Sequence, residues 1–478
     1  MSIEAQNNNY GAGLVTRKCE FEMERPHPWK REYPSGCQFV VEDEETELVE
    51  CDGKIYCLAH LPMLDASGEH TRKAGIASDA EELKKFNNLV FECIRKFEKY
   101  KADENIEHPD HWPMDLTGVV FPGEIHFEKR FHKTLPPCLF YGAEFNGNAF
   151  FQGMKFPRKV NFGLSVFKKY AIFGACEFHD GANFDGATFE GEANFNSSKS
   201  KHRFSAKNVL CRGRVRFDHC NFDGPLELSG SVFDNELWLY DGKFKDVLIE
   251  GGSAGENIIP LIDAHDTTFK EKLDCTNRIF SNPSNFRNSK FHKAPKFFGS
   301  DLHEGTSFEG AEFLDTASAW AIVSYRILRK MMEANRAWHD MGMFYSLEQK
   351  SIRTTSNVDV GIKSLSYLYD LSSEYGQSTV KPIIWLACLN VAFFLIYLIG
   401  GVIEAFATNT MINSKFLMDI IHYTLLQMVR PFDAVVHLGE QAHRAHVYLV
   451  PFAMIQSIVN IGLLAVFIVA VRRKFRIS

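Results

Sequence analysis

FGACEFHDGANFDGATFEGEANF, residues 173–195, places its phenylalanines at intervals of five and six residues in strict alternation. An α-helix repeats every 3.6 residues and a β-strand every two, so neither produces this interval. A small residue, alanine or cysteine, stands two positions before each phenylalanine. The pattern predicts that one large and one small side chain of each unit point inward, while polar residues and glycines form the corners between units.

The same interval extends well beyond this stretch. It runs from Phe140 to Phe244, shifts in phase within residues 251–260, and resumes from Phe269 to Phe313. A period of 11 residues that is sustained over about 170 residues is typical of a solenoid, in which each repeat packs only against its neighbours.

The A-x-F-x-x unit resembles that of the pentapeptide-repeat family, in particular its Phe-centred variant with alternating five- and six-residue units. The resemblance covers about residues 140–315 and implies a right-handed, four-sided β-helix with about 22 residues per coil. Side chains one coil apart, such as Phe167 and Phe189, would then stack along one wall. Cysteines at inward positions, such as Cys176 and Cys220, are expected to be packing residues rather than metal ligands.

Two charge-free stretches near the end of the chain, residues 382–403 and 447–471, are 22 and 25 residues long. At about 1.5 Å of rise per residue, each can cross a hydrocarbon layer of about 30 Å. Basic residues crowd positions 472–476, and Lys363 and Lys381 precede the first stretch. The positive-inside rule therefore predicts that both ends of this region, and with them the N and C termini, face the cytoplasm.

A second resemblance concerns the junction before the first span. Tyr375, Gly376, Ser378, Lys381 and Pro382 form the pattern YG-x-S-x-x-(R/K)-P, and the chain ends in the basic sequence VRRKFRIS. Both features resemble bacterial pentapeptide-repeat membrane proteins, in which a Phe-rich β-helix precedes a two-helix, channel-like domain. The resemblance implies a multi-pass protein of the bacterial inner (plasma) membrane.

Residues 412–440, between the two spans, interleave apolar residues with Asp419, His422, Thr424 and Gln427. The apolar run is too short to cross the bilayer, so it predicts a re-entrant or interfacial helix. Span, short helix, tight turn and span is the layout of a two-helix ion-channel pore. No TVGYG-type sequence is present, so a potassium filter is not predicted.

Several residues of this segment are candidates for pore lining or ion selectivity. Thr424 and Gln427 could line a pore or bond to neighbouring helices. Arg430 would disfavour cations at the mouth of a symmetric pore, unless Asp433 pairs with it or its side chain only reaches lipid headgroups. The candidate set is Thr424, Gln427, Val429, Arg430, Pro431, Phe432 and Asp433.

The predicted function is an oligomeric ion channel or pore with a cytoplasmic β-helix that acts as a sensor or scaffold for a protein or ligand. A tetramer is favoured by analogy with two-helix channels, and a pentamer stays open. The alternative is a non-conducting, membrane-anchored scaffold whose β-helix binds a protein partner. A net charge of −7 gives no electrostatic footprint for nucleic acid, and no sequence signature of an enzyme is present.

The N-terminal region contains a candidate metal site. Cys19, Cys37, Cys57 and His60 could complete a Cys₃His tetrahedron around a structural zinc ion, with Cys51 as the alternate ligand; the other interpretation is unbound buried thiols. The chain begins without the apolar run of a signal peptide and contains 11 scattered cysteines, which favours a reducing compartment over a disulfide framework.

The expected fold is mainly a β-solenoid, with an α-helical membrane domain of two spans and a re-entrant helix, and a small N-terminal α+β domain. Ser78-x-x-Glu81 is typical of a capping box for a helix that runs to about Lys101. One apolar stripe over residues 316–353 predicts a helix that caps the rod or packs between subunits. The predicted segments are 1–75 (small Cys/His domain), 76–117 (helix and linker), 118–315 (β-helix), 316–381 (helical cap and juxtamembrane linker) and 382–478 (membrane domain).

Overall fold

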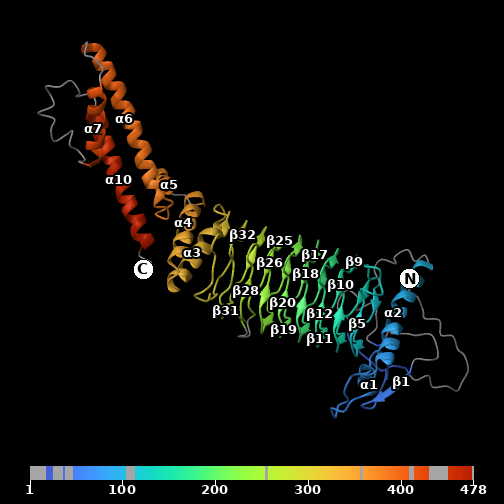
Figure 1. Cartoon of the computed structure of the whole chain (residues 1–478). Helices are drawn as coiled ribbons and strands as arrows, with labels where there is room; N and C mark the ends of the chain where they lie inside the picture. The colour runs from blue at the N-terminus through green and yellow to red at the C-terminus, as the bar shows by residue number, and fades with distance from the viewer. Residues whose placement is uncertain are drawn as a thin grey trace, which may run out of the picture. The chain divides into compact units, whose positions relative to one another are not determined.

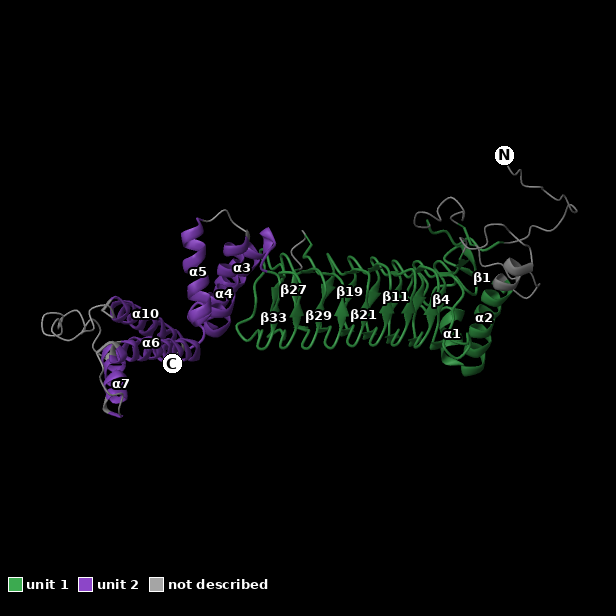
Figure 2. Ribbon diagram, turned by 90° about the horizontal axis from the view of Figure 1, so that it is seen from above, with its two compact units in different colours: residues 1–315 green, residues 316–478 purple. Residues whose placement is uncertain are grey.

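The structure is a computed structural model that describes residues 18–24, 36–37, 47–103, 113–252, 257–355, 359–408, 414–429 and 450–475. The chain divides into two compact units, Met1–Asp315 and Thr316–Ser478, shown in green and purple in Figure 2.

The first unit is dominated by a four-sided β-solenoid built from two-residue strands (Figure 1). One face contains β3 (Met114–Asp115), β6 (Cys138–Leu139), β10 (Val160–Asn161), β14 (Ala182–Asn183), β18 (Phe204–Ser205), β22 (Leu226–Glu227), β26 (Val247–Leu248) and β30 (Leu273–Asp274). A second contains β4 (Val120–Phe121), β7 (Glu144–Phe145), β11 (Val166–Phe167), β15 (Thr188–Phe189), β19 (Leu210–Cys211) and β23 (Val232–Phe233), followed by the pair β27 (Ile258–Ile259) and β31 (Ile279–Phe280).

The remaining two faces have the same construction. The third contains β5 (Ile125–His126), β8 (Ala149–Phe150), β12 (Ala171–Ile172), β16 (Ala193–Asn194), β20 (Val215–Arg216), β24 (Leu237–Trp238) and β28 (Ile262–Asp263). The fourth contains β9 (Lys155–Phe156), β13 (Glu177–Phe178), β17 (Lys199–Ser200), β21 (Asn221–Phe222), β25 (Lys243–Phe244), β29 (Thr268–Phe269), β32 (Lys290–Phe291) and β33 (Glu312–Phe313).

The strands of each face are parallel, and their register confirms the solenoid that the sequence predicts. Phe167 aligns with Phe145 of the preceding coil on one side and with Phe189 of the following coil on the other. The rings stack face to face, with centroids 4.6 Å apart for Phe145 and Phe167 and 5.0 Å apart for Phe167 and Phe189. The interior is thus a column of stacked rings, which excludes water and buries the repeated phenylalanine in every coil.

A tight turn explains the five-residue units. The second residue after the large side chain has a positive φ at Gly153 (71°), Leu164 (55°), Ala175 (56°) and Gly186 (69°), so the same conformation recurs once in every two units. A backbone hydrogen bond of 2.9 Å from the amide of Ala187 to the carbonyl of Phe184 closes one such turn. This is the geometry of a type II turn, which requires a positive φ at its third residue. Units with one more residue turn the alternate corners.

The phase shift near residue 255 corresponds to extra residues in one coil. Before it, Val215 pairs with Leu237, at the regular separation of one coil. Across it, Lys243 pairs with Thr268, which lies further along the chain than the regular repeat would place it. Three of the four sheets continue past this point through the pairs β24–β28, β25–β29 and β26–β30, so the extra residues leave the stack of coils intact.

The cysteines at inward positions are packing residues, as the sequence predicts. Cys176 and Cys220 are buried, and their thiols donate hydrogen bonds of 3.1 Å to the carbonyls of Phe151 and Phe195. Burial raises the pKa of Cys176 to about 12. A thiol with so high a pKa is a poor nucleophile at neutral pH.

A hairpin and two helices precede the solenoid: β1 (Leu48–Cys51), β2 (Lys54–Cys57), α1 (Arg72–Ser78) and α2 (Ala80–Asp103). Phe91 of α2 packs edge to face on Phe127 and Phe131, with ring centroids 5.5 and 5.7 Å apart. The helix thereby covers the core at the N-terminal end of the rod, an end that a solenoid must protect from water.

The capping box predicted at Ser78 is wrong. Ser78 is the last residue of α1, and Asp79 caps α2 by accepting hydrogen bonds of 2.8 and 3.1 Å from the amides of Glu81 and Glu82. Both residues are good N-caps, and the break between two consecutive helices shifts the cap by one position.

The second unit is helical in its described parts: α3 (Ala319–Ala334), α4 (Trp338–Thr355), α5 (Val360–Ser373), α6 (Val380–Thr408), α7 (Ser414–Val429) and α10 (Val450–Phe475). The single helix predicted over 316–353 is a pair, α3 and α4, because the chain turns at Asn335 and at Arg336, whose φ is 58°. The apolar stripe continues across this turn, which is why periodicity alone does not reveal it.

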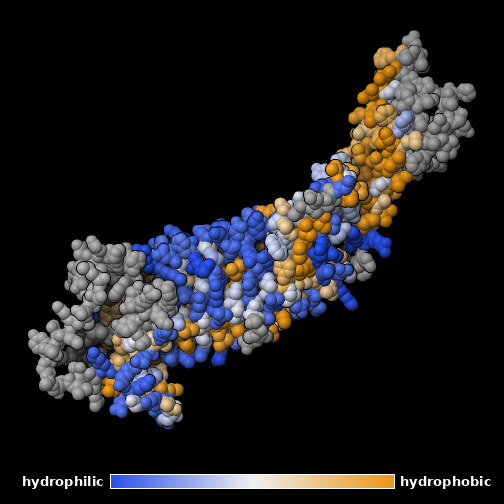
Figure 3. Space-filling view, turned by 180° about the vertical axis from the view of Figure 1, so that it is seen from behind, coloured by the Kyte–Doolittle hydropathy of each residue, from blue (hydrophilic) through white to orange (hydrophobic). Residues whose placement is uncertain are grey.

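Two of these helices, at Val380–Ile403 and Pro451–Arg473, are long and apolar enough to cross a membrane. Few of their residues are buried (11% and 28%), unlike those of a helix in the core of a soluble protein. Figure 3 shows apolar residues, in orange, covering this part of the second unit.

Candidate functional site

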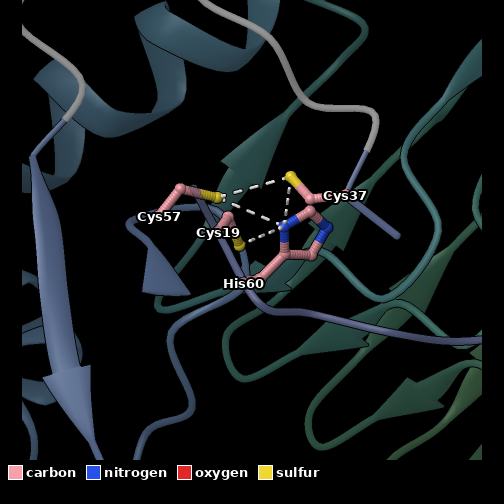
Figure 4. Close-up of side chains that lie close together, drawn as sticks. All are labelled: Cys19, Cys37, Cys57 and His60. Atoms are coloured by element: carbon pink, nitrogen blue, oxygen red, sulfur yellow. Dashed lines mark hydrogen bonds between the residues drawn. The ribbon is translucent and has the colours of Figure 1, made fainter. Parts of the chain in front are cut away.

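Four side chains from distant parts of the sequence form a cluster in the first unit (Figure 4). Cys57 ends strand β2, and His60 follows in a turn closed by a 3.0 Å hydrogen bond from its amide to the carbonyl of Cys57. Cys19 precedes Glu20, whose amide bonds to the carbonyl of Ile55, and Cys37 follows Gly36, which bridges to Glu22. Backbone pairing of the Cys19 segment with the hairpin, and of the Cys37 segment with the Cys19 segment, therefore brings the four residues together.

The spacing of the cluster suits a tetrahedral metal ion. The Nδ1 atom of His60 lies 3.2 Å from the sulfurs of Cys37 and Cys57 and 3.8 Å from that of Cys19. The sulfurs of Cys37 and Cys57 are 3.9 Å apart, and all four atoms lie within 4.8 Å of one another. Zn–S bonds of about 2.3 Å and Zn–N bonds of about 2.0 Å require edges of about 3.5 to 3.8 Å. The cluster can therefore hold a metal ion with little movement.

Groups around the cluster hold the imidazole in place. The Nε2 atom of His60 hydrogen-bonds to the carbonyl of Thr117 at 3.1 Å, so Nδ1 faces the sulfurs. The ring of Phe21 stacks on that of His60 with centroids 4.0 Å apart. A Cβ at Gly118 would lie 2.1 Å from the Phe21 ring, so this position requires glycine. Such outer contacts orient a metal ligand.

Hydrogen bonds within the cluster couple the protonation states of its members. Those from Cys37 and Cys57 hold the pKa of the Cys19 thiol far below its ordinary value, which favours the thiolate, whereas the hydrogen bond with Cys19 raises the pKa of the Cys37 thiol. Burial lowers the pKa of His60, but hydrogen bonds to Cys19 and Cys57 outweigh it and raise that pKa to about 9. A metal ion at this site would therefore displace protons from the imidazole and from Cys37.

Cys51, the alternate ligand, is not one of the four. Its thiol donates to a carboxylate oxygen of Asp52 at 3.5 Å. It stands in strand β1 opposite Lys54, at the far end of the hairpin from Cys57. The register of this hairpin, which spacing does not reveal, separates the two cysteines.

A second arrangement of polar side chains lies between the helices of the membrane hairpin. Gln456 of α10 donates to the side-chain oxygen of Asn390 at 2.7 Å and to the backbone carbonyl of Thr424 at 3.2 Å. It also accepts a 2.7 Å hydrogen bond from the hydroxyl of Tyr397. Asn390 in turn donates to Asn460 at 2.9 Å. This polar network joins α6, α7 and α10.

The structure places two of the seven candidate pore residues beside this network. Gln427 is fully buried and accepts a 3.4 Å hydrogen bond from Ser457, whereas the hydroxyl of Thr424 donates to the carbonyl of Ile420. Val429 is the last residue of α7. Pore lining stays a prediction for all of them. The other four, Arg430, Pro431, Phe432 and Asp433, lie outside the described residues.

The central members of the network were not among the residues predicted from the sequence. Asn390 and Tyr397 are seven residues apart in one span, and Gln456 and Asn460 are four apart in the other. Either spacing places two polar residues on one face of a helix. Polar residues that share a face within an otherwise apolar span are a signal that could have found them.

Residues 140–199 match the model of a protein family described as pentapeptide repeats (9 copies). No curated protein and no solved structure matches the chain.

Proposed function

We propose that this protein is an oligomeric ion channel or pore of a bacterial inner membrane, and that the second unit forms the pore. The rod consists of pentapeptide repeats, and this fold does not by itself imply an activity. The rod is the channel's cytoplasmic sensor or scaffold, available to a protein or ligand. Basic residues at the cytoplasmic ends of the spans, among them Lys381, Arg472 and Arg473, support this orientation.

The buried polar network is the observation that carries the proposal. A helix that only anchors a protein has no need of asparagine and glutamine within its apolar length, because each costs free energy in hydrocarbon. Here Asn390, Gln456 and Asn460 all lie within the spans, and they hold α7 through the backbone of Thr424. Polar groups inside a membrane segment are typical of a pathway for ions or substrates.

The length and packing of α7 also support a channel. With 16 residues it is about 24 Å long, which is shorter than the hydrocarbon layer of about 30 Å. It packs against both α6 and α10, as the short helix between the spans of a channel does.

The pore requires several copies of the chain, since two spans cannot enclose a channel. Apolar side chains on the outer faces of both spans, such as Ile399 and Ile468, are exposed and available to lipid or to a neighbouring subunit. A tetramer is the proposed assembly, with a pentamer as the alternative.

Conductance of the purified full chain in a planar bilayer tests this function. We expect ion currents with a defined reversal potential under a salt gradient, and a shift of that potential in Arg430→Ala. Arg287→Ala, which removes the same charge from the exposed surface of the rod, is the matched control and should leave it unchanged. Silence over a wide range of voltage, pH and membrane tension would contradict the channel and leave a non-conducting scaffold.

We also propose that the Cys₃His cluster binds a structural zinc ion. Three sulfurs and one imidazole nitrogen are the ligands that zinc prefers, and four protein ligands leave no position for substrate. The ion would join the segments around Cys19 and Cys37 to the hairpin and, through the bond from His60 to Thr117, to the first coil of the rod.

Metal analysis of the anaerobically purified full chain tests the zinc proposal. About one zinc ion per chain is expected in the unmodified protein and in the Cys51→Ser control, and none in Cys57→Ser. Absence of zinc from the unmodified protein, or loss of zinc from Cys51→Ser alone, would overturn the assignment.

A further inference from the structure

Helix α5 has its polar and apolar sides reversed relative to a helix of a soluble protein. Its polar side faces α4: Asp370 of α5 forms a 2.9 Å ion pair with Arg353 of α4 and lies 3.5 Å from Lys350 of the same helix. Its apolar side is exposed, with 68% of Leu365 and 58% of Leu368 accessible to solvent. A helix of a soluble protein turns its apolar side toward the core, so this side of α5 needs another cover.

An apolar groove lies along this exposed side. It has a volume of about 820 Å³ and lies within the second unit. Leu365, Leu368 and Leu371 of α5 form one wall, and Trp385 of α6 and Leu463 and Val466 of α10 are on the others. The groove thus joins a helix outside the spans to the surface of the spans themselves.

The position of the groove along the spans is set by its lining residues. Trp385 follows Lys381 by one turn, and Val466 precedes Arg472 by less than two turns. In the proposed orientation this is the cytoplasmic boundary of the bilayer. The indole of Trp385 donates a 3.1 Å hydrogen bond to the carbonyl of Leu371, which fixes α5 at this level. Tryptophan is enriched at this depth, where one edge of the ring is apolar and the other is wet.

Charge at this level is complementary to an anionic headgroup. Lys363 belongs to α5, and Arg472 and Arg473 belong to the end of the second span. The acidic groups nearby are engaged within the chain, since Glu374 pairs with Lys381 at 2.5 Å and Asp370 pairs with Arg353. Basic residues beside a span attract the headgroups of anionic lipids.

We propose that α5 lies in the cytoplasmic interface of the membrane and that the groove holds an acyl chain of an anionic phospholipid. This inference rests on the proposed membrane placement of α6 and α10. Lipid is the occupant because the span residues that line the groove belong to the surface that faces acyl chains in a bilayer. Ile384, which precedes the groove residue Trp385 in the first span, is also exposed.

Lipid retention by the full chain tests the inference. The protein is reconstituted in phosphatidylcholine vesicles that contain phosphatidylglycerol, extracted in mild detergent, and its bound lipid is counted by native mass spectrometry. We expect retained phosphatidylglycerol to fall about tenfold in Leu368→Glu, because a carboxylate replaces an apolar wall and repels the headgroup. Leu64→Glu, the same substitution at an exposed position of the first unit, is the matched control and should retain the lipid.

A second measurement applies to the unmodified chain. Phosphatidylglycerol that is brominated near the headgroup end of its acyl chains should quench the fluorescence of Trp385, seen as the difference between the unmodified protein and Trp385→Phe. Equal lipid retention in both glutamate variants, together with no quenching of Trp385, would overturn the inference. A change of oligomeric mass in Leu368→Glu without loss of lipid would also overturn it, and would assign the groove to a second copy of the chain.

Vesicle flotation separates this inference from the proposed function. A chain that does not float with vesicles has no membrane placement, and both proposals fail. A chain that floats and conducts but retains no anionic lipid refutes the groove assignment alone.

Discussion

At the scale of single residues, the rod depends on a backbone conformation with positive φ, which recurs at one type of turn between its faces. Non-glycine residues occupy it at Leu164, Ala175, Ser197 and Asn208, all with φ between 54° and 58°. A side chain other than glycine costs about 1 kcal/mol or more in this region, because Cβ approaches the carbonyl oxygen. The stacked coils on either side hold these turns in place despite that cost.

The first prediction follows from this conformation. Ala175→Gly should raise the free energy of unfolding of the rod by about 1 kcal/mol, and Gly186→Ala should lower it by a similar amount, since both residues have a positive φ. Chemical denaturation of the purified full chain, followed by far-UV circular dichroism, measures both. The two substitutions are reciprocal controls, and the same sign of change in both would contradict the assignment of the turn.

At the scale of elements, the membrane hairpin depends on hydrogen bonds between helices. Hydrocarbon offers no other partner for the buried amides and hydroxyls of this network, so they must satisfy one another. Gln456 is its centre, because its side chain bonds to Asn390, Tyr397 and the backbone of Thr424. The short helix α7 is therefore coupled to both spans.

The second prediction tests that coupling. Gln456→Leu should destabilise the hairpin by about 1 to 2 kcal/mol, because the groups bonded to Gln456 lose their partner inside an apolar environment. Thermal unfolding of the full chain in detergent measures the effect. Ile458→Leu, at an exposed position two residues further along the same helix, serves as the control. Equal melting temperatures in the two variants would show that the network contributes nothing to stability.

At the scale of the whole molecule, the two units have different physical requirements. The rod is stabilised by the repeated burial of phenylalanine, and its N-terminal end is proposed to bind a zinc ion. The second unit is stabilised by helix packing and hydrogen bonds, and it is proposed to conduct ions and to bind lipid. A result on zinc therefore does not decide the question of conductance, and each unit requires its own experiment.

Sequence alone determined the solenoid, because every coil repeats the same large and small residues and each strand pairs only with its neighbours. In such a fold, the pattern of one repeat is enough to predict the arrangement of all the coils. It also determined the two apolar spans, since length and hydropathy decide whether a helix can cross a membrane. The metal cluster was found in the same way, because Cys57 and His60 stand at the spacing of zinc ligands, although the other two ligands were only candidates among several cysteines.

Only the tertiary structure decided which groups meet across long separations. The hairpin register places Cys57 rather than Cys51 beside Cys19 and Cys37, and a turn at Asn335 divides one predicted helix into two. The network around Gln456 and the groove along α5 depend on how helices pack, and Asn390 and Asn460, 70 positions apart, are hydrogen-bonded in that network. Spacing along the chain records which face of a helix a residue occupies, whereas the partner of that face is set by packing in three dimensions.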